Sequence, residues 1–199
     1  MKKYHFLILP LVLAYFVGGA ASFELIELVE TARSQIGRTL IYDPSYRALD
    51  YPNGDVPIDR GVCTDVIIRA LRMAYNYDLQ KYVHEDMKGN FSKYPQLWGL
   101  SRPDKNIDHR RVPNLKTFFN RQGWSLPLTR RVSDYQAGDI ITCIVPPRLA
   151  HIMIVSDKVG RNNTPLVIHN IGSGTQEEDL LFAFEMTGHY RIKGNIPDS

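Results

Sequence analysis

The spacing of the apolar residues changes from helical to strand-like partway along the chain, and this change restricts the possible folds more than any other feature. Apolar residues recur every three or four positions in residues 24–36 and again after Cys63, which predicts two amphipathic helices. A shorter helix is predicted at residues 113–122, with proline in its first turn and Gly123 as its C-terminal cap. Residues 84–112 lack this spacing, and we expect them to be irregular.

From residue 139 onward the apolar runs are short and rich in β-branched residues, which is typical of strands. The predicted strands are residues 139–145, 151–155, 166–169 and 180–186, with a final strand at 189–192. Helices first and strands afterwards predict an α+β domain in which N-terminal helices pack on a mostly antiparallel sheet. Between the first two helices, the prolines and glycines of residues 38–61 predict a long ordered loop, which is usually a functional segment.

The N-terminus has the pattern of a secretory signal peptide. Lys2 and Lys3 precede an apolar run of about a dozen residues, and small residues end at Ala21. This run is shorter than the roughly 20 residues that a permanent membrane span requires. We therefore expect residues 1–21 to be a signal peptide, cleaved after Ala20 or Ala21, and residues 22–199 to be one exported domain, periplasmic or secreted, without a stable membrane anchor.

Charge and metal-binding motifs exclude two classes of function. The formal net charge is +3, and Lys2 and Lys3 supply two of these charges, so the exported part has too little positive charge to suggest nucleic-acid binding. His84, Glu85 and Asp86 are consecutive, and three consecutive residues of regular structure cannot all face one ion. We interpret them as a solvated turn, and we expect no metal and no cofactor.

Cys63 begins the second predicted helix, after a polar, glycine-containing turn. Unpaired N–H groups and the helix dipole favour negative charge at a helix N-terminus, so this position is expected to lower the pKa of a thiol. The same N–H groups are suited to stabilise an oxyanion. The alternative is a disulfide between Cys63 and Cys143, which an exported chain with two cysteines permits.

Two histidines are candidates for the base that such a thiol requires. If the strands around Gly160 form an antiparallel hairpin, His151 lies opposite His169 on one face, and one imidazole is able to orient the other. The connecting loop is long enough for the register to shift by two residues without changing that face. Asn170 would point to the opposite face.

Several motifs, in this order, resemble the NlpC-like cysteine peptidases of the papain-fold superfamily. They are ETARSQIGRTLIYD, GVCTDVIIRA, AGDIITCIV, HIMIVSD and VIHNIG. More closely, YPNGDVP, GVCTDV, NIDHRRVPNL, HNIG and GHYR resemble the bacterial domain-of-unknown-function family numbered 1287, a secreted branch of that group. The resemblance covers nearly all of residues 22–199 and implies a papain-like NlpC-type fold.

The resemblance also implies roles for three residues: Cys63 as nucleophile, His151 as base and His169 as the third polar residue. One motif departs from the pattern, because the wider group usually has Cys-Ser-Gly where this chain has Cys63-Thr64-Asp65. A carboxylate near the thiol opposes thiolate formation. Asp65 could instead cap the helix or bind a cationic group of the substrate. Tyr42 or Tyr46 could replace the displaced tyrosine of the wider group.

The segment before the third predicted helix is a second candidate for substrate binding. It contains His109, Arg110 and Arg111, and arginine forks suit the carboxylates of a peptide. The alternative is a set of internal salt bridges that fix a long loop.

The sequence and the resemblance together predict an exported cysteine hydrolase. Its expected substrate is peptidoglycan or muropeptides, cleaved at an amide bond within the stem peptide or between muramic acid and alanine. Three alternatives stay open. They are a papain-like acyltransferase or thioesterase acting on lipid or acyl substrates, a non-catalytic binding domain with a Cys63–Cys143 disulfide, and an exported effector that attacks a competitor's wall.

Overall fold

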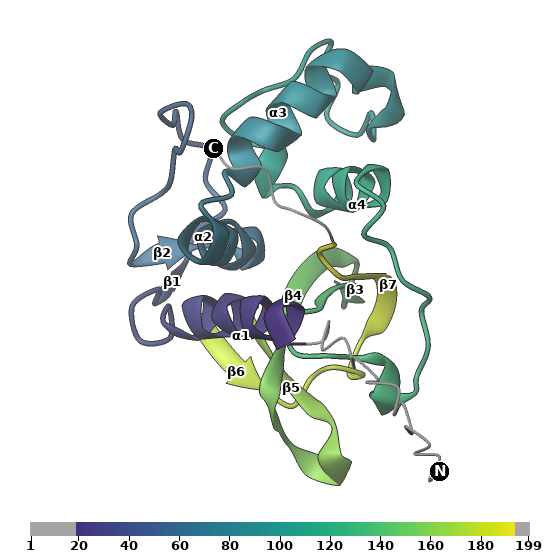
Figure 1. Cartoon of the computed structure of the whole chain (residues 1–199). Coiled ribbons are helices and arrows are strands. Elements are labelled where there is room, and N and C mark those ends of the chain that lie inside the picture. Colours follow the sequence, from purple (N-terminus) through teal and green to yellow (C-terminus); the bar gives the residue numbers. More distant parts are fainter. Residues whose placement is uncertain (1–18, 194–199) are drawn as a thin grey trace, which may run out of the picture.

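The structure, a computed structural model, describes residues 19–193 and has the predicted α+β class (Figure 1). Helices α1 (Gly19–Arg33) and α2 (Cys63–Tyr75) pack against each other and cover one face of a sheet, contacting its strand β4. Helices α3 (Leu79–Asn90) and α4 (Val112–Arg121) pack together beyond α2. The second helix therefore begins at Cys63, as predicted.

The main sheet has five strands in the order β6-β5-β4-β3-β7, and every neighbouring pair is antiparallel. Its strands are β3 (Ile140–Val145), β4 (Leu149–Val159), β5 (Pro165–Asn170), β6 (Thr175–Glu178) and β7 (Glu185–Tyr190). The loop at residues 38–61 adds a small parallel pair, β1 (Ile41–Tyr42) with β2 (Arg60–Gly61). This pair fixes the chain immediately before Cys63.

The hairpin of β4 and β5 has a register two residues away from the predicted one. Ile154 pairs with Ile168 and Val155 with Val167, so His151 is not directly opposite His169. Nearer the turn the register shifts by two more residues, because Val159 pairs with Pro165 after an irregularity between Val155 and Val159. Because the shift is an even number of residues, both histidines keep a common face, as the sequence allowed.

Two hydrophobic clusters lie on opposite faces of the sheet. The larger cluster joins the helices to the sheet and contains Cys63, Ile152 and Ile154. The smaller cluster contains Cys143 and Met153, with Leu181 closing it. Residues that alternate along β3 and β4 therefore divide between the two clusters, as expected for a sheet buried on both faces.

The expectation that residues 84–112 are irregular is wrong at its start, because α3 continues to Asn90. Only Leu79, Val83 and Met87, at spacings of four residues, give this helix an apolar face. Asp78 caps it by accepting a hydrogen bond from the backbone N–H of Gln80 at 3.1 Å. His84, Glu85 and Asp86 consequently lie in a helix rather than a turn.

The predicted strand at 180–186 is correct only at its end, where Glu185 and Met186 begin β7. Residues 181–183 form a turn from which Leu181 enters the smaller cluster, and β6 lies before the predicted strand. β6 was not predicted because it is a polar strand at the edge of the sheet, without an apolar pattern. Hydrogen bonds to Glu177 hold it, donated by Ser156 at 2.5 Å and by Lys158 at 3.0 Å. The predicted final strand corresponds to the end of β7.

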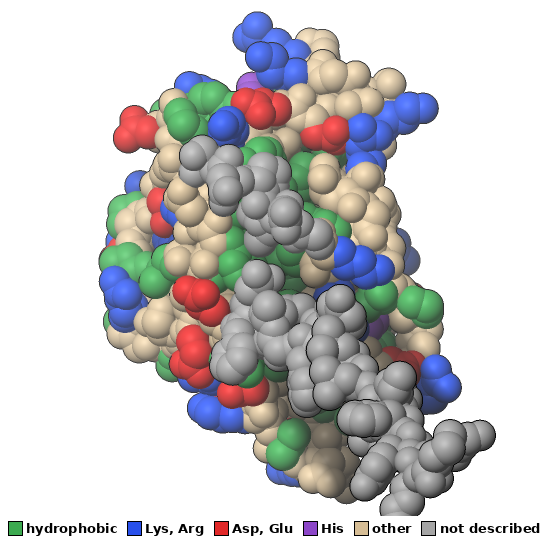
Figure 2. Space-filling view, viewed as in Figure 1, with side chains coloured by type: hydrophobic (Ala, Val, Ile, Leu, Met, Phe, Trp, Pro, Cys, Tyr) green, Lys and Arg blue, Asp and Glu red, His purple; other side chains and the backbone are tan. Residues whose placement is uncertain are grey.

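The described residues do not test the export prediction. Acidic and basic side chains both occur around the face shown in Figure 2, and neither sign dominates it. Within residues 19–193, no helix combines the length and apolar character needed to cross a bilayer. The predicted signal peptide lies almost wholly outside the described residues, so it stays a prediction.

Candidate active site

Cys63 is the first residue of α2, and its thiol is 4% exposed. Burial raises the pKa of this thiol to about 12, although the backbone N–H groups of Ile152 and Thr64 act in the opposite direction. The expectation that the helix N-terminus lowers the pKa below its usual range is therefore wrong for this state of the protein. Removing the sulfur from water outweighs the N-terminal N–H groups.

The two predicted histidines are joined by a hydrogen bond. Nε2 of His151 lies 3.0 Å from Nδ1 of His169, with the rings nearly perpendicular. Both side chains are almost fully buried, and burial lowers the pKa of His151 to about 3. The imidazole of His151 is therefore neutral at physiological pH, which is the form that can accept a proton.

His169 forms a second hydrogen bond, to Glu178, a residue that the sequence did not predict to be part of the site. Nε2 of His169 lies 3.1 Å from Oε2 of Glu178 on β6. Glu178 is opposite Val167, two residues before His169 on the same face of β5. Its role could not be found without β6, since the predicted strand lay farther along the chain.

The thiol lies beside the beginning of β4, the strand that carries His151. The sulfur of Cys63 faces the backbone N–H of Ile152, the residue that follows His151. His151 pairs with Cys143 across β3 and so points to the face opposite the helices. Within the described side chains no hydrogen bond joins Cys63 to His151. The catalytic pairing of Cys63 with His151 therefore stays a prediction.

The disulfide alternative does not agree with the structure. Cys63 and Cys143 are both free and buried. They belong to the hydrophobic clusters on opposite faces of the sheet, so the sheet lies between them. A bridge would require the backbone to move, because a disulfide needs Cα atoms within about 7 Å and Cβ vectors that converge.

Asp65 and Arg110 form a buried ion pair with each other. Nε and Nη2 of Arg110 donate to the two carboxylate oxygens of Asp65, both at 2.9 Å, and each side chain is at most 3% exposed. Asp65 also accepts a hydrogen bond at 2.6 Å from the backbone N–H of Val62, the N-cap of α2. Of the roles left open for Asp65, the structure therefore shows the helix cap, and Arg110 takes the role of an internal salt bridge.

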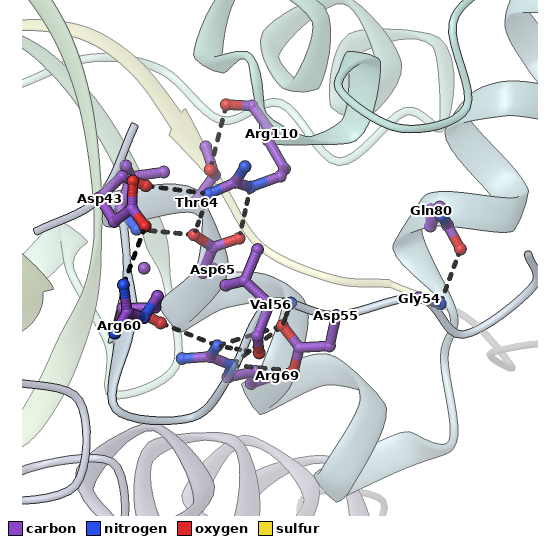
Figure 3. A network of polar contacts seen from close by, with 12 residues as sticks. Asp43, Gly54, Asp55, Val56, Arg60, Thr64, Asp65, Arg69, Gln80 and Arg110 are labelled. Carbon is purple, nitrogen blue, oxygen red and sulfur yellow. Dashed lines mark hydrogen bonds and ion pairs between the residues drawn. The ribbon is translucent and has the colours of Figure 1, made fainter. Parts of the chain in front are cut away.

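The long loop before Cys63 is ordered by polar contacts, which Figure 3 shows. Arg69 of α2 binds the carboxylate of Asp55 at 2.9 Å and the carbonyl oxygens of Val56 and Arg60, both at 3.0 Å. Gln80 of α3 accepts a hydrogen bond from the backbone N–H of Gly54 at 2.9 Å. These side chains satisfy backbone groups that an irregular segment would otherwise leave unpaired.

A cleft of about 190 Å³ opens beside Cys63. Apart from Arg110 and Arg111, the residues around it are apolar or aromatic. The guanidinium of Arg111 stacks on Trp98 at 4.0 Å and binds Asp108 at 2.9 Å. The cleft therefore contains two cationic side chains, and each of them is paired with a carboxylate of the protein.

The remaining candidates divide between the cleft and its surroundings. Tyr42 lines the cleft, and burial raises the pKa of its hydroxyl, with a smaller contribution from Cys63. Tyr46 instead bonds to Asp104 at 3.1 Å and Asn106 at 2.8 Å. His109 is 2% exposed and does not line the cleft, and burial lowers its pKa to about 3. Among the described residues, no group of acidic, histidine or cysteine side chains forms a metal site.

Comparisons with known proteins bear on the fold and on the family. The fold is similar to NlpC1 from Trichomonas vaginalis, with 13% identity and a TM-score of 0.44, over 88% of this chain and 45% of that protein's length. The chain is 60% identical over 164 residues to the "Uncharacterized protein YijF" of Escherichia coli (strain K12), covering 82% of this chain and 80% of that protein. Residues 29–192 match the family described as Domain of unknown function (DUF1287). The chain therefore belongs to the DUF1287 family.

Proposed function

We propose that this protein is an exported cysteine hydrolase that cleaves an amide bond in peptidoglycan, either within the stem peptide or between muramic acid and alanine. The observation that supports this most is the buried pair of His151 and His169 at the end of β4 that Cys63 contacts. A neutral imidazole and a thiol at a helix N-terminus are the two groups that nucleophilic catalysis by cysteine requires.

In the proposed reaction the proton of the Cys63 thiol passes to Nδ1 of His151 as the sulfur attacks the carbonyl carbon. The oxyanion of the tetrahedral intermediate faces the backbone N–H groups at the start of α2. His151 then returns the proton to the leaving amine as the C–N bond breaks, which leaves an acyl-thioester on Cys63. Water attacks this ester, with His151 again accepting a proton, and the carboxylic acid and the thiol are released.

Peptidoglycan as the substrate is supported by the signal-peptide pattern of residues 1–21 and by the motif resemblance. The cleft adds a restriction on the part of the substrate beside Cys63. Because Arg110 and Arg111 are both paired with protein carboxylates, the cleft favours an uncharged, partly apolar group such as a small side chain next to the scissile bond.

The apolar cleft also favours a second candidate function, the transfer or hydrolysis of acyl groups from lipid or thioester substrates. Both reactions pass through an acyl-thioester on Cys63, so they differ in the substrate and not in the residues that act.

The test is to incubate purified peptidoglycan with the wild-type protein, Cys63→Ala and Cys143→Ala, and to identify muropeptides by mass spectrometry. We expect cleavage by the wild type and by Cys143→Ala, and none by Cys63→Ala, because Cys143 lies on the other face of the sheet. Circular dichroism confirms that each variant is folded. Cleavage that persists in Cys63→Ala contradicts the proposal. An acyl-thioester formed from a radiolabelled lipid, without muropeptide release, supports the second candidate instead.

A further inference from the structure

His151, His169 and Glu178 are joined in series by hydrogen bonds, and Glu178 decides which ring nitrogens of the two histidines carry a proton. A neutral imidazole carries one proton, on either Nδ1 or Nε2, and its hydrogen-bond partners decide which. Because Nε2 of His151 is engaged by His169, this ring can accept a further proton only if its Nδ1 is bare. Something must therefore hold its proton on Nε2.

Glu178 supplies this selection. As a carboxylate it only accepts hydrogen bonds, so the contact of 3.1 Å to Nε2 of His169 requires that atom to carry the proton. Nδ1 of His169 is then unprotonated and must accept from His151 across 3.0 Å. His151 consequently carries its proton on Nε2, and its Nδ1 is bare.

In the described part of the sheet, no other charged side chain adjacent to the two histidines lies on their face, so Glu178 is the residue that sets their tautomers. Cys143 lies opposite His151 in β3, and Gln176 lies opposite His169 in β6. Neither is charged in the folded protein at neutral pH, since burial raises the pKa of Cys143 to about 11. Glu177 points to the other face, where it binds Arg33 at 2.7 Å. Among residues 25–193, no hydrogen bond to Nδ1 of His151 is formed, so no described side chain competes for this atom.

We propose that Glu178 is a positioning residue that fixes the tautomers of His169 and His151 and leaves Nδ1 of His151 unprotonated as the base for Cys63. The inference rests on the proposed function for its catalytic meaning. When His151 accepts the thiol proton it becomes an imidazolium, His169 stays neutral, and Glu178 stays a carboxylate. The negative charge of Glu178 then stabilises the positive charge on His151 through the intervening ring.

The first test reads the tautomers directly. In protein labelled with ¹⁵N-histidine, we expect NMR spectra to show a protonated Nε2 and a bare Nδ1 in both rings, assigned with His151→Gln and His169→Gln. In Glu178→Gln the amide is able to donate as well as accept, so the selection is lost and protonated Nδ1 appears. Glu178→Asp keeps an acceptor and retains the wild-type tautomers.

The second test measures the consequence for Cys63, in a Cys143→Ala background so that one thiol reports. We expect Glu178→Gln to slow both peptidoglycan cleavage and iodoacetamide alkylation by about 10- to 100-fold near neutral pH, the range that a charge-assisted hydrogen bond provides. Glu178→Asp should lie closer to the wild type. Glu185→Gln removes the same charge from an exposed position on β7 and serves as the control.

The outcomes separate this inference from the proposed function. A protonated Nδ1 on His151 in the wild type overturns the inference even if Glu178→Gln does not fold. So does a Glu178→Gln variant whose tautomers are unchanged and whose rates stay within twofold of Glu185→Gln. If the tautomers respond as expected but Cys63→Ala still cleaves peptidoglycan, the proposed function fails while the assignment of Glu178 as the residue that sets the tautomers stands.

Discussion

The ion pair between Asp65 and Arg110 allows a sharp test of what holds the nucleophile in place. In Asp65→Ala, the Arg110 guanidinium stays buried and loses its carboxylate, and the backbone N–H of Val62 loses its acceptor. Removing one partner of a buried pair costs about 3–5 kcal/mol, and the loss of a helix cap costs about 1 kcal/mol. The two effects share one carboxylate, so we expect a total of about 4 kcal/mol.

Urea denaturation followed by circular dichroism measures this loss. With a denaturant dependence of about 2 kcal/mol per molar urea, the midpoint falls by about 2 M. The matched control is Asp59→Ala, which breaks the contact of Asp59 with Arg60 at 3.1 Å, where the aspartate side chain is 48% exposed. Solvent screens an exposed pair, so the control should move the midpoint far less than Asp65→Ala does.

The double variant Asp65→Ala/Arg110→Met distinguishes two causes of the lost stability. One is the loss of the attraction between Asp65 and Arg110, and the other is the cost of leaving the Arg110 guanidinium buried without a carboxylate. Because methionine removes the unpaired guanidinium, we expect this variant to recover a large part of the stability that Asp65→Ala loses. If Asp65→Ala unfolds at the same urea concentration as Asp59→Ala, the reasoning is refuted. If Asp65→Ala is as stable as Asp59→Ala but no longer cleaves peptidoglycan, Asp65 acts on the substrate rather than on the helix.

Two further predictions follow from the burial of the titratable groups. The pKa values of His109 and His151 are both lowered to about 3 in the folded protein, against about 6.5 in the unfolded chain, so the unfolded state binds more protons between these values. The stability that the neutral forms of these two histidines contribute is fully present above about pH 6.5 and is lost as the pH falls toward 3. Calorimetry should therefore show an unfolding midpoint temperature that decreases over this pH range. A midpoint temperature that does not change with pH contradicts this. In Cys143→Ala, iodoacetamide at pH 8 should alkylate Cys63 at least tenfold faster in denaturing urea than in the native protein, because burial raises the thiol pKa to about 12. Equal rates would show that the thiol is exposed.

The parts of the fold that the sequence predicted are those with a strong apolar pattern. The helix that begins at Cys63 and the strands β3, β4 and β5 were predicted because their buried residues form dense periodic runs. Helix α3 was missed because three apolar positions are too few to distinguish it from a polar loop. Strand β6 was missed because its position at the edge of the sheet depends on side-chain partners from α1 and β4.

The candidate site was predicted in its residues but not in its energetics. Spacing indicated that His151 and His169 share a face, and this survives a register shift of two residues because strand side chains alternate with period two. Nothing local predicts Glu178, which lies on an unpredicted strand. The pairing of Asp65 with Arg110, 45 residues apart, and the burial of the thiol likewise depend on tertiary packing.

Burial also determines how the proposed reaction must proceed. With the thiol pKa at about 12 and the His151 pKa at about 3, a thiolate and imidazolium pair in the resting protein costs on the order of 10 kcal/mol before the two charges attract each other. Two unit charges brought to 4 Å from each other would regain only about 4 kcal/mol at an effective dielectric constant of 20. The resting pair is therefore neutral. Proton transfer becomes accessible only when it is coupled to formation of the C–S bond, which moves the negative charge from the buried sulfur to an oxyanion that faces the N–H groups of α2, while Glu178 compensates the positive charge on the other side of His151.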